Sequence, residues 1–178
     1  MQIVAVIAAI IVVAIAIVLI VAAGKPNVFR LARSAQIKAP PEAITLYVVD
    51  FQKWTGWSPW EGVPGDELQR TYSSAKSGVG AVYDWQGKKT GVGRMEMIEV
   101  EPRRVGIKLH FFKPFEAHNV AEFTFEPTAE PGVTAVVWSM HGPANLRTKV
   151  MHTLMNMDKM VGPSFEQGLA KLKGLAEG

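Results

Sequence analysis

The sequence has no cysteine, and beyond its first 23 residues it has no second long uncharged hydrophobic run. The lack of cysteine excludes a disulfide-stabilised scaffold and a metal site with cysteine ligands. A membrane-spanning helix needs about 20 mostly apolar residues, so the lack of a second run excludes a multi-span membrane protein. Residues 24–178 carry all the charged side chains, five Trp and eight Phe. They suffice for one domain with a substantial core.

Residues 1–23 consist almost entirely of Ile, Val and Ala, and Gln2 is their single polar side chain. As a helix, residues 3–23 span about 30 Å, the thickness of a hydrocarbon core, and would contact membrane lipids. We therefore predict a transmembrane anchor at residues 1–23. A cleaved signal peptide is the alternative, with a cleavage site after residues 21–23. The basic segment and the shorter apolar stretch typical of signal peptides are missing.

The basic residues near this anchor all follow it, at Lys25, Arg30 and Arg33. By the positive-inside rule, this distribution predicts a single-pass membrane protein with its domain in the cytoplasm. Near an anionic leaflet each of these residues would add about 1 kcal/mol of attraction. Residues 24–28 are predicted to form a short hinge that keeps the domain close to the bilayer.

The domain, residues 29–178, has patterns of both strands and helices. Alternating apolar residues predict a strand over 29–38, and two prolines end it before a helix that runs to about residue 50. A Trp-rich connection follows. Turn residues then separate six predicted strands at 68–73, 81–86, 91–100, 104–111, 117–126 and 134–141. The last segment, 150–177, is predicted to be helical, with Gly162-Pro163 kinking or splitting it.

No helix is predicted between the six consecutive strands, which favours an antiparallel meander. In each strand the apolar residues alternate with polar ones, so that one face of the sheet is apolar and the other is wet. The most economical packing is a curled sheet with the terminal helix across its concave face. We therefore predict an α+β fold, preceded by one transmembrane helix.

Five segments of the domain form a distinctive set, namely Ala39-Pro40-Pro41-Glu42, Trp57-Ser58-Pro59-Trp60, Gly80-Ala81-Val82-Tyr83-Asp84-Trp85, Val137-Trp138-Ser139-Met140-His141-Gly142 and Phe165-Glu166-Gln167-Gly168-Leu169-Ala170. Together they resemble the polyketide cyclase/dehydrase branch of the START-like (SRPBCC) superfamily. The resemblance covers about residues 29–176. It implies a helix-grip fold, in which a curved antiparallel sheet wraps a long carboxyl-terminal helix around a hydrophobic cavity. Because members include lipid carriers, aromatase/cyclases and hormone receptors, the fold alone does not define the function.

The apolar strand faces, the Trp-rich connection and the terminal helix supply the residues that we expect to line this cavity. They are Trp54, Tyr83, Trp85, Met95, Met97, Leu109, Phe111, Phe123, Trp138, Met140, Met151 and Met155. The methionines would form an adaptable wall for an undemanding apolar ligand, although methionine is also common in ordinary cores. Trp54, Trp57 and Trp60 would line the mouth, stack on a ligand or contact the membrane interface, unless they pack in the core.

The sequence has few candidates for catalysis. No cofactor motif, nucleophile elbow or zinc-binding spacing is present, and His110 and His141 fall on the wet face of their strands. Tyr83 and Asp158 are the weak candidates for an acid and a base. A buried Asp158 would have a raised pKa, whereas a surface Asp158 would pair with a neighbouring Lys or Arg. Arg33, on the inward face of its strand, would pair with a ligand carboxylate or reach solvent.

Three functions remain open from the sequence. The first is a membrane-anchored protein that binds a hydrophobic small molecule such as a lipid, quinone, isoprenoid or polyketide. The second is a cyclase, dehydratase or hydrolase acting on such a ligand. The third is an accessory subunit whose helix packs on a larger membrane complex through small residues at Ala5, Ala8 and Ala9. Scattered Lys and Arg residues argue against nucleic-acid binding.

Overall fold

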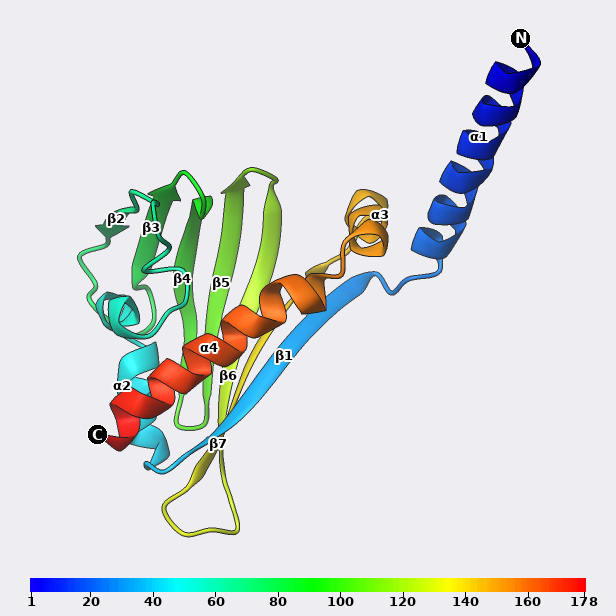
Figure 1. Ribbon diagram of the computed structural model, residues 1–178. Helices are drawn as coiled ribbons and strands as arrows, with labels where there is room; N and C mark the ends of the chain where they lie inside the picture. Colours follow the sequence, from blue (N-terminus) through cyan, green and yellow to red (C-terminus); the bar gives the residue numbers. More distant parts are fainter.

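The computed structural model describes residues 1–178 and begins with one long helix, α1 (Gln2–Ala23), that projects away from the rest of the chain (Figure 1). Its 22 residues have a mean hydropathy of 3.6 over the most apolar stretch, and its side chains are exposed along most of its length. The helix is therefore long and apolar enough to span a membrane, a property that it shares with signal sequences.

The domain is built on one seven-stranded antiparallel sheet. Its strands are β1 (Val28–Ile37), β2 (Gln69–Tyr72), β3 (Val82–Gly87), β4 (Gly91–Glu101), β5 (Arg104–Lys113), β6 (Ala117–Pro127) and β7 (Thr134–Pro143). Their order is β1-β7-β6-β5-β4-β3-β2, so the first strand pairs with the last. The predicted meander is confirmed, and every predicted strand corresponds to an observed one.

Four helical segments follow or connect these strands. They are α2 (Pro41–Val48), the short 3-10 helix η1 (Phe51–Gly56), α3 (Leu146–Leu154) and α4 (Met157–Glu177). Helix α4 crosses the concave face of the curved sheet (Figure 1), and this confirms the predicted helix-grip arrangement. Helix α3 lies at the end of the domain where α1 is attached, and α4 runs from there across the sheet toward α2.

The break in the terminal helical region does not occur at Gly162-Pro163. It occurs at Met155, which has an extended backbone. Helix α4 then begins at Met157, capped by Asn156, whose side chain accepts a hydrogen bond from the Lys159 backbone N–H at 3.1 Å. Pro163 lies inside α4, where its missing N–H costs one backbone hydrogen bond. Gly162 has a packing role, because a Cβ there would collide with the guanidinium of Arg33.

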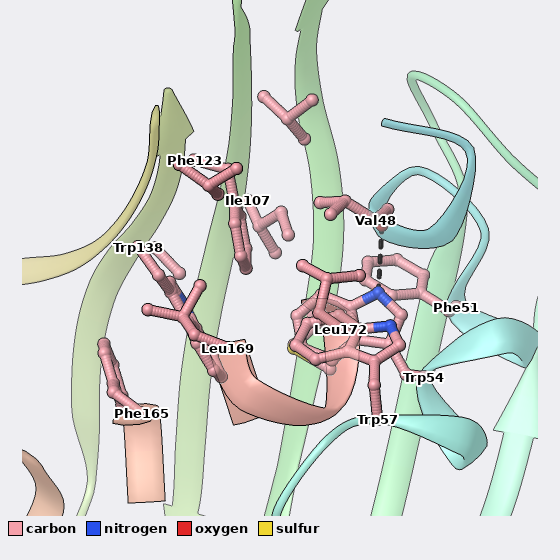
Figure 2. Packing of buried hydrophobic residues seen from close by; sticks show 14 of the residues in the cluster. Val48, Phe51, Trp54, Trp57, Ile107, Phe123, Trp138, Phe165, Leu169 and Leu172 are labelled. Atoms are coloured by element: carbon pink, nitrogen blue, oxygen red, sulfur yellow. Dashed lines mark hydrogen bonds between the residues drawn. The ribbon is translucent and has the colours of Figure 1, made fainter. Parts of the chain in front are cut away.

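The core lies where α4, α2 and η1 meet the sheet, and aromatic residues dominate it (Figure 2). Trp54 and Trp57 are both buried, and their indole N–H groups donate to the backbone carbonyls of Val48 at 2.9 Å and Tyr47 at 3.0 Å. Trp138 stacks on Phe165 of α4 with ring centroids 4.1 Å apart. Of the three neighbouring Trp residues, Trp54 and Trp57 therefore pack in the core.

Candidate functional site

A cavity of about 980 Å³ lies between the concave face of the sheet and the helices α3 and α4. Hydrophobic residues make up 18 of its 30 lining residues. The long strands β3 to β7 provide one wall, the connection after η1 provides a second through Ser58, Trp60 and Glu61, and α3 provides a third through Met151. The volume lies at the upper end of the range of known ligand sites, about 300–1,000 Å³.

Nine of the twelve residues expected at the cavity border it. They are Trp54, Tyr83, Trp85, Met95, Leu109, Phe111, Trp138, Met140 and Met151. The other three expectations are corrected. Met97 and Phe123 are fully buried in the core, and Met155 is exposed at the end of α3. Strand parity identifies the apolar face, but it does not separate the part of that face covered by α4 from the part left open.

A second pocket of about 380 Å³ adjoins the first near the anchor. The two share four lining residues, Phe29, Met140, His152 and Met157. The smaller pocket is also lined by Lys25 and Arg30, two of the residues expected to flank the membrane. The hollow space of the domain therefore extends toward the end at which α1 is attached, where its lining is more polar.

A buried polar cluster interrupts the apolar wall of the larger cavity. The Tyr83 hydroxyl donates to Glu61 Oε1 at 2.6 Å, and Arg70 Nε donates to Glu61 Oε2 at 2.6 Å. The side chain of Glu61 is only 4% exposed. Burial, and then the hydrogen bond to Glu61, raises the pKa of the Tyr83 hydroxyl far above its usual value. Tyr83 is therefore a protonated phenol that acts as a hydrogen-bond donor.

Sequence reasoning singled out Tyr83 but missed Glu61 and Arg70. Glu61 directly follows Trp60, and an acidic residue at the end of a Trp-rich segment was the one available signal. The partnership with Tyr83 joins residues 22 positions apart and depends on how the connection after η1 folds over the sheet. Arg70 on β2 then neutralises the carboxylate, which makes its burial tolerable.

Two further polar side chains border the cavity with few partners. Trp138 is buried and its indole N–H makes no hydrogen bond. The amide nitrogen of Asn119 has only the weak acceptor Met140 Sδ, at 3.8 Å. Buried donors are usually satisfied by protein or water, so these two donors are exceptions among the lining residues.

Asp158 is not a buried acid. Its carboxylate is 64% exposed and receives two hydrogen bonds from Arg33, one from Nη1 at 2.8 Å and one from Nη2 at 3.0 Å. The hydrogen bonds from Arg33 hold the pKa of Asp158 below its ordinary value. Arg33 also donates from Nε to Glu166 at 2.7 Å. Of the two alternatives that the sequence left open for Asp158, the structure shows the surface carboxylate paired with an Arg, not the buried acid.

The ion pair between Arg33 and Asp158 also argues against two other roles considered for these residues, ligand binding by Arg33 and acid/base catalysis by Asp158 with Tyr83. Arg33 is committed to two carboxylates of α4 and is not available to a ligand or to lipid headgroups. Asp158 borders the smaller pocket and Tyr83 the larger one. The structure therefore does not bring Tyr83 and Asp158 together as an acid/base pair.

The segment that connects α1 to the domain is held by polar contacts. Lys25 Nζ donates to the His152 carbonyl at 2.8 Å, and Lys149 Nζ donates to Asn27 Oδ1 at 2.7 Å. The Asn27 carbonyl also accepts from the Ala144 N–H at 2.7 Å. Residues 24–28, predicted as a hinge, are therefore fastened to α3 and to the residue after β7.

One known protein family has a sequence model that matches most of the chain. The sequence model of the family described as "Polyketide cyclase / dehydrase and lipid transport" matches residues 28–177. The chain belongs to this family. The match covers the whole sheet and α4, and it begins just after the connection to α1. No curated protein matches the chain significantly.

Solved structures of family-like proteins share the fold at low sequence identity. Protein CV1439 of Chromobacterium violaceum has a TM-score of 0.60 at 18% identity, over 86% of this chain and 99% of its own. Protein MLL2253 of Mesorhizobium loti has a TM-score of 0.57 at 20% identity, over 83% and 96%. The di-domain ARO/CYC protein BexL from the BE-7585A biosynthetic pathway has a TM-score of 0.63 at 14% identity, over 89% and 53%. At these identities the likeness shows the fold alone.

Proposed function

We propose that the protein is a membrane-anchored binding protein for a hydrophobic small molecule, such as a lipid, quinone, isoprenoid or polyketide-like compound. The observation that carries the proposal is the large cavity with its mostly hydrophobic lining beneath α4. The family description, which includes lipid transport, supports the same class of ligand. Burying apolar surface contributes about 25 cal/mol per Å², so a ligand that fills the cavity gains most of its affinity without specific contacts.

The position of α1 supports loading of this cavity from a membrane. Helix α1, helix α3 and the turn between β5 and β6 all lie at the same end of the domain (Figure 1). Three large apolar side chains are exposed there, Phe115 in that turn and Leu146 and Leu154 on α3. Phe115 also lines the cavity. A domain tethered in this way meets membrane-dissolved ligands at high effective concentration.

A cytoplasmic location of the domain remains part of the proposal. It follows from the basic residues after α1, but the structure changes how they contribute. Arg33 pairs with Asp158 and Glu166, and Lys25 donates to a backbone carbonyl. Arg30 is exposed and forms no ion pair, so it is the flanking residue best placed to meet an anionic headgroup.

An enzymatic role has less support than binding. The two weak acid/base candidates, Tyr83 and Asp158, border different pockets, and Tyr83 is held as a hydrogen-bond donor to Glu61. An accessory role in a membrane complex has one supporting observation, because α1 exposes its small residues Ala5, Ala8 and Ala9 to a potential partner helix. Co-purification of a stable partner from solubilised membranes would favour that role over a free carrier.

Extraction of bound molecules tests the proposed function. The full chain is purified from membranes in mild detergent, its bound small molecules are extracted, and native mass spectrometry measures how many chains carry one. We expect a hydrophobic compound at close to one per chain. A chain that carries none and takes up no lipid, quinone or isoprenoid from added vesicles would contradict the proposal.

A further inference from the structure

Two histidines face each other across the β5–β6 hairpin on the outer, convex side of the sheet. His110 on β5 and His118 on β6 are directly opposite in the strand register, with ring centroids 3.8 Å apart. Glu116 lies in the turn just before β6. The two histidines are eight positions apart in the sequence, a spacing that matches no zinc motif, so only the pairing of the strands brings the three side chains together.

The geometry points to a binding site for a divalent transition-metal ion formed by His110, Glu116 and His118. Glu116 Oε1 lies 3.4 Å from His110 Nε2 and 3.6 Å from His118 Nε2. All three ligand atoms lie within 4.8 Å of one another. Ligand atoms that surround a tetrahedral zinc ion at about 2.0–2.1 Å are separated by about 3.3 Å. A small closing movement of the side chains therefore completes the site.

The same distances are too long for a strong direct interaction. A charged N–H group that donates to a carboxylate prefers about 2.7–2.9 Å. Both imidazoles are instead arranged around one carboxylate oxygen at the larger separation. Glu116 forms no ion pair with any Lys or Arg, so no cationic side chain competes for its carboxylate.

The ligand set limits the identity of the ion. Two imidazole nitrogens and one carboxylate oxygen suit Zn²⁺, Cu²⁺, Ni²⁺ or Co²⁺, whereas Ca²⁺ and Mg²⁺ prefer oxygen ligands. Three protein ligands leave a fourth position for water or another molecule. The strands fix the backbone of both histidines, and the Phe112 ring packs against His110 with centroids 4.2 Å apart.

The site adjoins the mouth of the cavity, although its histidines are on the outer face. Glu116 and His118 both border the cavity, as does Phe115 in the same turn. An ion held by Glu116 would tie this turn to β5 and β6. Metal binding at this place would thus stiffen the part of the mouth that carries Phe115.

Metal uptake by the full chain tests the inference independently of any ligand in the cavity. The untagged protein in detergent is dialysed against ZnCl₂, and bound zinc is measured per chain. A parallel titration with Cu²⁺ followed by electron paramagnetic resonance reports nitrogen ligands. We expect one ion per chain, with affinity lowered at least about tenfold by His118→Ala and by Glu116→Gln.

His152→Ala is the matched control, because His152 lies on α3 and is not one of the three ligands. It should bind zinc as the unmodified chain does. Circular dichroism checks that each variant is folded, and His118 and Glu116 are exposed enough for substitution to leave the core intact. Equal zinc affinity in the unmodified, His118→Ala and Glu116→Gln chains, or a loss of binding in His152→Ala, would overturn the inference.

Discussion

The Tyr83 hydroxyl donates a 2.6 Å hydrogen bond to Glu61 in the wall of the cavity. The pair connects β3 to the loop that closes one side of the site, and Arg70 on β2 completes it. A buried carboxylate in an otherwise apolar wall gives the cavity one fixed polar point. Because this carboxylate is buried, the stability of this region depends on each hydrogen bond that the carboxylate accepts.

Removal of the Tyr83 hydroxyl should destabilise the domain. In Tyr83→Phe, Glu61 loses one of its two side-chain donors while it remains buried, so we expect a loss of about 1–3 kcal/mol in the free energy of unfolding. Tyr72→Phe is the control, because the Tyr72 ring stacks on Tyr83 but its hydroxyl has no hydrogen-bond partner. Urea unfolding should show a clearly smaller effect for Tyr72→Phe; equal effects would argue against the role of the hydrogen bond.

Asp66 should make the stability depend on acid pH. Its carboxylate accepts from the Thr90 hydroxyl at 2.6 Å and from the backbone N–H groups of Lys89 and Thr90, and these bonds lower its pKa to about 2. Since the folded pKa lies below the unfolded value, this stabilisation is present above the ordinary value of 3.8 and is lost as pH falls toward about 2.

Asp66→Asn should therefore reduce stability at pH 6 and make little difference near pH 2. Glu67→Gln is the control, because Glu67 is exposed and has only a surface ion pair with Lys88 at 3.1 Å. Thermal unfolding between pH 2 and pH 6 measures the stability of both variants and of the unmodified chain. A gap between the unmodified chain and Asp66→Asn that stays constant across this range would contradict the assignment.

Substitutions of Met151, on α3, and of Met155, directly after α3, should differ in their effect on ligand binding. Met151 borders the cavity, whereas Met155 is exposed outside it. Met151→Asp would place a charge against the apolar ligand and should weaken uptake of a hydrophobic probe at least about tenfold. Met155→Asp should leave uptake within about twofold. Probe titration by fluorescence decides, and equal losses in both variants would place the ligand elsewhere.

The lack of cysteine makes the side of the membrane directly measurable. A single cysteine introduced as Glu130→Cys in the β6–β7 loop would be the sole thiol in the chain. With a cytoplasmic domain, a membrane-impermeant maleimide should label it only after cells are opened. Labelling of intact cells would show that the domain lies on the outer side of the membrane. The intact mass of the labelled chain shows in the same experiment whether residues 1–23 are retained.

Most of the fold was predictable because it depends on local patterns. Alternating apolar residues marked the strands, and turn residues separated them. The break between α3 and α4 was placed wrongly, since Pro163 is tolerated within α4 and the break occurs where Met155 becomes extended. Side-chain capping by Asn156, rather than the proline, determines where α4 begins.

The site was less predictable because its polar contacts join distant segments. Arg33 and Asp158 are 125 positions apart, and their ion pair depends on α4 crossing β1. The approach is possible because Gly162 leaves room for the guanidinium. Likewise, Met97 and Met95 share a strand face, and only the position of the core decides that Met95 borders the cavity and Met97 does not.

The most direct test of the central claim compares two neighbouring substitutions on β6. Ala121 borders the cavity, whereas Val120 points to the opposite face of the sheet. Native mass spectrometry of the full chain measures the fraction that retains a hydrophobic molecule. The account predicts full retention in the unmodified chain and in Val120→Phe, and lower retention in Ala121→Phe, whose phenyl ring takes up part of the cavity. Equal retention in both variants, or none in the unmodified chain, would contradict it.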